Sequence, residues 1–225
     1  MTRKDDPVKK IKARLTERAH LDPRKTPVEV RMEGDAVVIE GMVERIAQKK
    51  RALLAAMEQD GVRGVVDRLL VRPSSRMTDA EIRDHLNAAF MGEAALKDAG
   101  IKVSSERGIV DLEGAVGSLS HKRLAGVLAW WVPGAADVIN SLEVTPPEED
   151  SPDELRDALT IILEKDRLVD AAAITVDVNG WVVTLGGAAQ SEAEREAAED
   201  DAWYVWGVND VVNNIRTTAP ARPGR

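Results

Sequence analysis

Hydrophobic residues in this chain follow two periods, and the same order of periods occurs three times. Apolar residues spaced three or four positions apart predict amphipathic helices, whereas strict alternation predicts half-buried strands. Each copy opens with a helical pattern. The apolar positions are Ile11, Leu15 and Ala19 in the first copy, Ile82, Leu86, Ala89 and Phe90 in the second, and Leu155, Leu159, Ile162 and Leu163 in the third.

A β-hairpin is predicted after this first helix. Residues 174–178 alternate between apolar and polar, Asn179-Gly180 suits the positive φ angles of a tight turn, and residues 181–185 form the returning strand. The corresponding hairpins pair residues 28–32 with 37–39 and residues 101–103 with 109–112.

A second helix and a last strand complete each copy. The helix carries small residues four apart, which allow it to lie close to a sheet: Ala52 and Ala56, Ala125 and Ala129, Ala198 and Ala202. The last strands are predicted at 65–71, 138–144 and 211–215. The fold class is therefore α+β, with three tandem α-β-β-α-β modules, each packing two helices on one face of a three-stranded mixed sheet.

Glycines mark the repeat. Gly61, Gly134 and Gly207 lie 73 residues apart, and further glycines precede each of them at nearly constant distances. This spacing divides the chain into modules at 1–73, 77–146 and 151–217, and residues 218–225 are predicted to be a disordered tail. Each module is small for an independently stable core, so packing between copies is plausible.

Composition narrows the possible functions. The chain of 225 residues has no cysteine, which excludes disulfides and thiolate chemistry. No apolar run is long enough to span a bilayer. The polar amino terminus lacks the pattern of a signal peptide, so the residues by themselves predict a cytoplasmic protein.

Charge is distributed unevenly along the chain. Residues 1–73 contain 17 Lys and Arg against 12 Asp and Glu, whereas residues 148–225 contain 7 against 17. The overall net charge of −8 is not that of a nucleic-acid-binding protein, and we expect no nucleic acid as a partner.

The repeat resembles the BON domain (bacterial OsmY and nodulation). The resemblance is carried by Gly108-Ile-Val-Asp-Leu-Glu-Gly114-Ala-Val116 and by Gly207-Val-Asn-Asp-Val-Val-Asn-Asn-Ile215. It implies a non-catalytic binding module, and members of this family are typically cell-envelope proteins linked to osmotic or envelope stress. Phospholipid binding is attributed to some of them. The resemblance therefore implies a periplasmic location as the alternative to the cytoplasm, and it supplies no catalytic residue.

Tryptophans form the first candidate binding site. Four of the five lie at the end of the second helix: Trp130, Trp131, Trp203 and Trp206. Because Ala129 and Val132 take the core positions, Trp130 or Trp131 should point towards solvent or a neighbour. The tryptophans could insert at the headgroup level of a membrane or bind a protein partner. Alternatively, they pack between the copies or are buried at the end of the helix.

Basic residues of the first helix form the second candidate site. Lys9, Lys10 and Lys12 could attract an anionic phospholipid surface. They could also form an ordinary solvated helix face, or dock onto the acidic third copy of another molecule. The acidic run from Glu192 to Asp201 is interpreted as a solvated helix face, since its carboxylates spread around a helix.

These patterns predict a non-catalytic binding or scaffold protein that contacts phospholipid or a protein partner of the cell envelope. The alternative is a structural self-assembly module. No pattern of a catalytic site, cofactor site or metal site occurs in the sequence, so we expect no cofactor and no bound metal. An enzyme is the third and weakest interpretation.

Overall fold

The computed structural model describes residues 6–218, which fold as two compact units divided between Ser74 and Ser75. The first unit contains the first copy, and the second unit contains the other two copies. The predicted tail at 218–225 lies, except for Thr218, outside the described residues.

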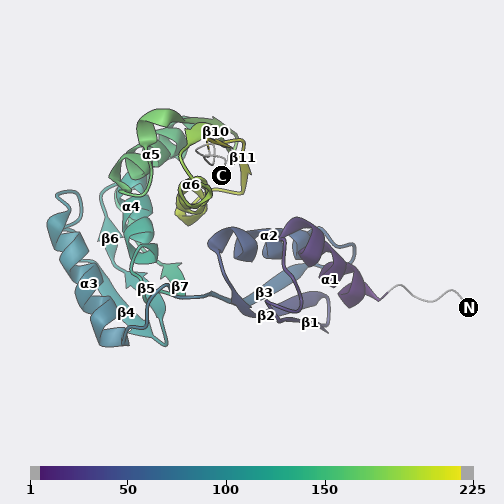
Figure 1. Ribbon diagram of the computed structural model, residues 1–225. Coiled ribbons are helices and arrows are strands. Elements are labelled where there is room, and N and C mark those ends of the chain that lie inside the picture. Colours follow the sequence, from purple (N-terminus) through teal and green to yellow (C-terminus); the bar gives the residue numbers. More distant parts are fainter. Residues whose placement is uncertain (1–5, 219–225) are drawn as a thin grey trace, which may run out of the picture. The chain divides into compact units, whose positions relative to one another are not determined.

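The first unit has the predicted order of elements (Figure 1). Its elements are α1 (Pro7–Arg18), β1 (Val28–Glu33), β2 (Ala36–Val43), α2 (Ile46–Met57) and β3 (Gly64–Val71). Strand β2 lies in the centre of the sheet, antiparallel to β1 and parallel to β3.

The second copy repeats this arrangement with shorter strands. Its elements are α3 (Asp79–Gly92), β4 (Lys102–Glu106), β5 (Ile109–Glu113), β6 (Ala115–Val116), α4 (Leu119–Trp130), β7 (Asp137–Asn140) and β8 (Glu143–Val144). Strand β5 pairs with β4 in antiparallel fashion and with β7 in parallel fashion.

The third copy has the same topology. Its elements are α5 (Pro152–Lys165), the 3-10 helix η1 (Ala171–Ala173), β9 (Ile174–Asn179), β10 (Val182–Ala189), α6 (Glu192–Tyr204), β11 (Asp210–Asn213) and β12 (Arg216–Thr217). Strand β10 pairs antiparallel with β9 and parallel with β11 and β12. The fold class, a three-stranded mixed sheet with two helices repeated three times, is confirmed.

The last strand differs from the prediction in the second and third copies, where it is interrupted. The Asn140 side chain accepts a hydrogen bond from the backbone N–H of Leu142 and donates one to the carbonyl of Lys122. Asn213 makes the equivalent bonds to Ile215 and Arg195. These side-chain bonds hold the chain where the strand is interrupted, while the backbone N–H groups of Ser141 and Asn214 still donate to the central strands.

The alanines of the second helices lie where the pattern predicts. Ala52, Ala56, Ala125, Ala129, Ala198 and Ala202 are all fully buried. Gly187 has a comparable steric role, with a φ of +96°, and a Cβ atom there would lie 2.1 Å from the carbonyl oxygen of Ala173. Gly187 is therefore required by the close approach of β10 to the backbone at the end of η1 and the start of β9.

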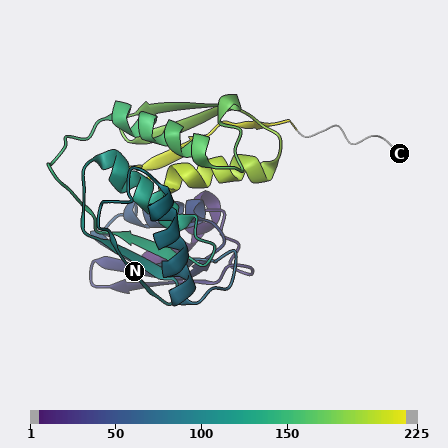
Figure 2. The same ribbon diagram turned by 90° about the vertical axis from the view of Figure 1, so that its left-hand side faces the viewer.

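Capping residues fix the starts of the first helices. Thr78 and Glu81 form a capping box at the start of α3, and the Ser151 hydroxyl accepts a hydrogen bond from the N–H of Glu154 at the start of α5. Figure 2 shows the helices of the third copy, in green to yellow, next to those of the second copy, in teal. The helical layers of these two copies thus pack against each other.

Candidate binding site between the second and third copies

Helix α4 of the second copy packs against α5 and α6 of the third (Figure 1). Arg123 on α4 is fully buried in this contact. Its Nη2 lies 2.6 Å and 2.7 Å from the two carboxylate oxygens of Asp150, and its Nε donates a hydrogen bond to the carbonyl of Trp206. One arginine therefore ties the linker between the copies to the end of α6.

Aromatic side chains close the same contact. The rings of Trp130 and Tyr204 stack with their centroids 5.2 Å apart, and Trp203 is buried, with 2% of its surface exposed. Trp206 is 45% exposed, and the Lys122 ammonium lies 4.6 Å from its ring centroid. The tryptophan cluster thus packs between the copies and leaves one indole largely at the surface.

Trp131 connects this cluster to a buried acid. Its Nε1 donates a 2.8 Å hydrogen bond to Oδ1 of Asp201 on α6, a residue that is only 1% exposed. The buried Oδ2 of Asp201 receives no hydrogen bond from any residue between 6 and 218. A carboxylate removed from water with one oxygen unpaired is energetically costly.

The surroundings of Asp201 favour its protonated form. Burial raises the pKa of Asp201 to about 8, and the nearby carboxyls of Asp166 and Asp200 act in the same direction. Asp166 also accepts a hydrogen bond from the protonated carboxyl, which raises the pKa further, whereas the Trp131 hydrogen bond opposes these effects. At neutral pH this position therefore holds a proton.

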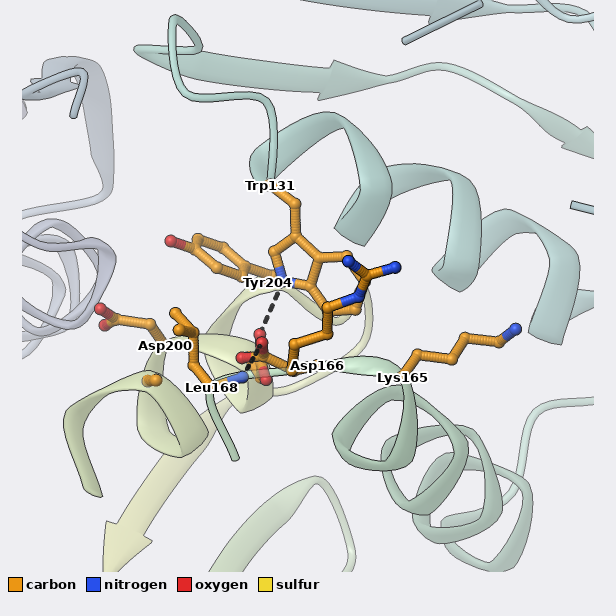
Figure 3. A pocket seen from close by; sticks show the side chains of 9 residues that line it. Trp131, Lys165, Asp166, Leu168, Asp200 and Tyr204 are labelled. Atoms are coloured by element: carbon orange, nitrogen blue, oxygen red, sulfur yellow. Dashed lines mark hydrogen bonds between the residues drawn. The ribbon is translucent and has the colours of Figure 1, made fainter. Parts of the chain in front are cut away.

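A pocket of about 490 Å³ opens beside these residues (Figure 3). Its walls come from the end of α4, the end of α5 with the following turn, and the last turns of α6. The lining residues with polar or aromatic groups are Trp131, Lys165, Asp166, Arg167, Asp200, Asp201 and Tyr204, and Leu168 and Ala197 complete the wall. Such a volume suits a small molecule or one long side chain.

The interpretation of the acidic run as solvated is wrong for three of its residues. Glu194, Glu199 and Asp201 are 9%, 3% and 1% exposed. Glu194 accepts hydrogen bonds from the backbone N–H groups of Asp170 and Gln190, so it anchors the loop before η1. The other three carboxylates of the run, Glu192, Glu196 and Asp200, are exposed or half-buried.

The other predicted site residues lie in the first unit. Lys9, Lys10 and Lys12 are exposed on α1, while Ile11 and Leu15 bury the opposite face. The structure therefore brings the four tryptophans together and places the lysines on a separate compact unit. Both sets stay predictions as binding residues.

Sequence reasoning missed Arg123, Asp150, Asp166 and Asp201. A signal for Asp201 exists in the repeat itself, because the 73-residue spacing places Ala55 and Leu128 at the corresponding positions of the other copies. A carboxylate at a repeat position that is apolar in the other two copies indicates a buried acid. Asp166 lies in a turn, where the other copies show no such apolar pattern. Only the packing of the folded chain brings it close to Asp201.

Metal-ligand clusters and membrane-spanning helices are both absent from residues 6–218. Within residues 6–218, no group of three or more His, Asp or Glu side chains is placed to hold a metal ion. Across the same residues, no helix has the length and apolar character needed to cross a membrane. What remains at the contact is a pocket with acidic and aromatic walls.

Comparison with known proteins gives the family. The BON domain model matches residues 6–73, 78–146 and 151–219. The chain is 28% identical over 158 residues to osmotically-inducible protein Y of Escherichia coli K12, covering 68% of this chain and 79% of that protein.

Solved structures of CdsD, a structural protein of the type III secretion system of Chlamydia trachomatis, are also similar. The C-terminal domain of CdsD matches with 16% identity and a TM-score of 0.27, covering 96% of this chain and 99% of that one. A second CdsD structure gives the same identity and TM-score over 94% of this chain. Because the BON domain model matches all three copies over nearly the whole sequence, the chain belongs to the BON domain family.

Proposed function

We propose that this chain is a non-catalytic binding protein of the cell envelope that contacts anionic phospholipid through helix α1. The observation that carries the proposal is the exposed basic face of α1. The helix contains Lys9, Lys10, Lys12, Arg14 and Arg18 but only one acidic residue, Glu17, and its first turn has no acid. All three lysines are exposed.

The energetics of such a face favour an anionic surface. Each Lys or Arg near anionic lipid contributes roughly 1 kcal/mol, and this attraction weakens as salt screens it. The three lysines would together contribute roughly 3 kcal/mol, which corresponds to about a 100-fold difference in affinity.

Membership in the BON family supports a location in the cell envelope and a role in osmotic or envelope stress. The similarity to osmotically-inducible protein Y points in the same direction. On these grounds we favour the periplasmic location over the cytoplasmic one that the amino-terminal residues predict. Binding of a protein partner in the envelope is the alternative use of the same surfaces.

Vesicle co-sedimentation of the full chain tests the proposal. We expect binding to vesicles containing phosphatidylglycerol, weaker binding at high salt, and little binding to pure phosphatidylcholine. Replacing Lys9, Lys10 and Lys12 with Ala should reduce the affinity by up to about 100-fold. The matched control replaces Lys97, Lys102 and Arg107 with Ala. These residues are exposed in the second copy, and their replacement removes the same amount of positive charge. Equal losses in the two triple variants would contradict a role specific to α1.

A second candidate function is self-assembly, which the opposite charges of the two units favour. Residues 1–74 contain 17 Lys and Arg against 12 Asp and Glu, whereas residues 75–225 contain 14 against 27. The basic unit of one molecule could then attract the acidic unit of another. Light scattering at several concentrations and salt levels tests this, and a monomer under all conditions would exclude assembly.

A further inference from the structure

We propose that the pocket between the second and third copies binds a primary alkylammonium group. The ammonium would donate a hydrogen bond to the buried Oδ2 of Asp201, and the alkyl chain would lie along Trp131 and Tyr204. This site is in the second unit and does not depend on the phospholipid contact proposed for α1.

The first support is the buried carboxyl of Asp201 in the pocket wall. Asp201 is 1% exposed, lines the pocket, and has Oδ1 occupied by the indole N–H of Trp131 at 2.8 Å. Its buried Oδ2 accepts no hydrogen bond from any of the described residues, and the Asp166 carboxyl, to which the protonated acid donates, lies beside Asp201. A ligand that reaches this oxygen with an N–H group would satisfy it, which is the usual requirement for a buried acceptor.

The second support is the charge of the walls. Three carboxyls line the pocket, those of Asp166, Asp200 and Asp201, against two basic side chains. The Lys165 ammonium is 2.8 Å from Oε2 of Glu93 and is neutralised by it, which leaves Arg167 as the remaining basic group of the lining. The pocket is therefore acidic, and a cationic ligand is electrostatically favoured there.

The third support is the aromatic wall. The rings of Trp131 and Tyr204 lie beside the carboxyl groups of Asp166 and Asp200 in the close view (Figure 3). Trp130 covers one face of the Tyr204 ring by stacking on it. Aromatic rings attract cations and provide apolar contact for an alkyl chain, so both ends of an alkylammonium find a suitable partner.

The same features select among cations. A metal ion is disfavoured, since no group of three ligating side chains within residues 6–218 is arranged to hold one. A quaternary ammonium would interact with the rings but has no N–H for Oδ2. A primary ammonium has three N–H donors and matches both the rings and the two facing carboxyls of Asp201 and Asp166.

Binding would release one proton. Asp201, with a pKa of about 8, is protonated at neutral pH, and the ammonium would take the place of that proton beside the ionised carboxylate. Protons therefore compete with the ligand below pH 8. The apparent affinity should rise roughly 100-fold between pH 6 and pH 9, a range in which an alkylammonium stays protonated.

The experiment is a titration of the full chain with butylammonium, followed by the indole N–H signal of Trp131 in ¹⁵N NMR. The signal is assigned by its loss in Trp131→Phe. We expect a saturable shift at pH 9, a roughly 100-fold weaker response at pH 6, and no saturable shift with tetramethylammonium. A capped Gly-Lys-Gly peptide distinguishes the source of the ammonium. Tighter binding of the peptide indicates a lysine side chain of a protein, and tighter binding of butylammonium indicates a free amine.

Two isosteric variants provide the controls. Asp201→Asn keeps an acceptor for Trp131 but removes the buried charge, and it should weaken binding by at least about 10-fold. Asp200→Asn removes the same charge from the pocket rim and should cost only about 3-fold. The proposal is overturned if no shift occurs at pH 9, if tetramethylammonium binds as well as butylammonium, or if Asp200→Asn weakens binding as much as Asp201→Asn.

Discussion

Helix α2 of the first copy and helix α6 of the third occupy the same place in one fold, yet their last turns have different environments. Met57 is 51% exposed on α2, whereas Trp203 at the corresponding position of α6 is 2% exposed. Ala55 fills a core position on α2, and Asp201 fills its equivalent on α6 with 1% exposed. A neighbouring copy therefore changes both the burial and the chemistry of a position that the fold alone would make apolar.

The difference follows from what each helix end contacts. In the second unit, α4 contributes Arg123 and Trp131, which donate to Trp206 and Asp201 in the third copy. The corresponding residues of the first copy are Lys50 and Glu58, and Glu58 is exposed. A polar group can be buried at α6 because its partner comes from the next copy.

Asp201→Asn should produce the largest effect, and it depends on pH. The folded state has a pKa of about 8 at Asp201 against an ordinary value of 3.8, so between these values the folded state holds a proton that the unfolded state has lost. The contribution of Asp201 to the free energy of unfolding is therefore full at about pH 4 and is lost as pH rises through 8. The loss is several kcal/mol and at most about 6.

The Asn side chain does not titrate, so the variant should match the wild type near pH 4 and be more stable at pH 9. Denaturation followed by tryptophan fluorescence measures this, because all five tryptophans lie in the second unit. Asp200→Asn serves as the control for removing a neighbouring charge. Parallel pH profiles for wild type and Asp201→Asn would show that the acid is not buried as described.

Arg123→Ala should have the next largest effect. It leaves the Asp150 carboxylate, whose side chain is 21% exposed, and the Trp206 carbonyl without their donor. We expect a loss of about 3 kcal/mol in the free energy of unfolding of the second unit, measured by fluorescence-detected denaturation. Lys50→Ala at the equivalent position of the first copy should cost less than about 1 kcal/mol by circular dichroism. Similar losses at both positions would contradict a special role for the contact between copies.

Trp131→Phe should have a moderate effect. It keeps most of the ring but removes the donor to Asp201, which costs about 1–2 kcal/mol. Because that hydrogen bond lowers the pKa of Asp201, its removal should raise the pKa further. The fall of stability with pH should then extend to higher pH than in the wild type. The control is Trp206→Phe, since the Trp206 indole N–H makes no hydrogen bond within residues 6–218, and it should leave the profile in place.

Trp130→Ala should have the smallest effect of the four. It removes the stacking on Tyr204 and should cost about 1 kcal/mol. Met57→Ala, at the same position of the exposed α2 end, should cost about 0.5 kcal/mol or less. Thermal unfolding of both variants measures the difference, and equal costs would mean that the ring contact contributes nothing beyond local helix packing.

Much of the fold could be predicted because it is specified by local patterns. The alanines of α2, α4 and α6 are small where the helix must approach the sheet, and the period of 3.6 residues marks that face. The interruption of the last strand could not be read in this way. It occurs next to Asn140 and Asn213, whose side-chain amides donate to carbonyls of the preceding helix, whereas Asp67 at the equivalent position of the continuous β3 has no amide to donate.

The candidate site could be predicted only in part. The tryptophan cluster is evident in the sequence, and packing between the copies is one of the interpretations that the sequence allows. The acid at 201 looked like part of a solvated helix because a helical pattern shows which residues share a face but not what covers that face. Asp166 and Arg123 gave no signal, since their partners are 35 and 27 residues away.

By itself, the sequence determined the three copies, the order of elements in each, and the division between a basic first copy and an acidic third. These properties are local or additive, so periodicity, glycine spacing and charge counts contain them. The tertiary structure alone decided that the second and third copies share one buried contact, and that Asp201 lies there with Trp131 on one oxygen and in the wall of a pocket. The physical reason is that burial and electrostatics depend on which surfaces meet, and residues far apart in the chain make that contact.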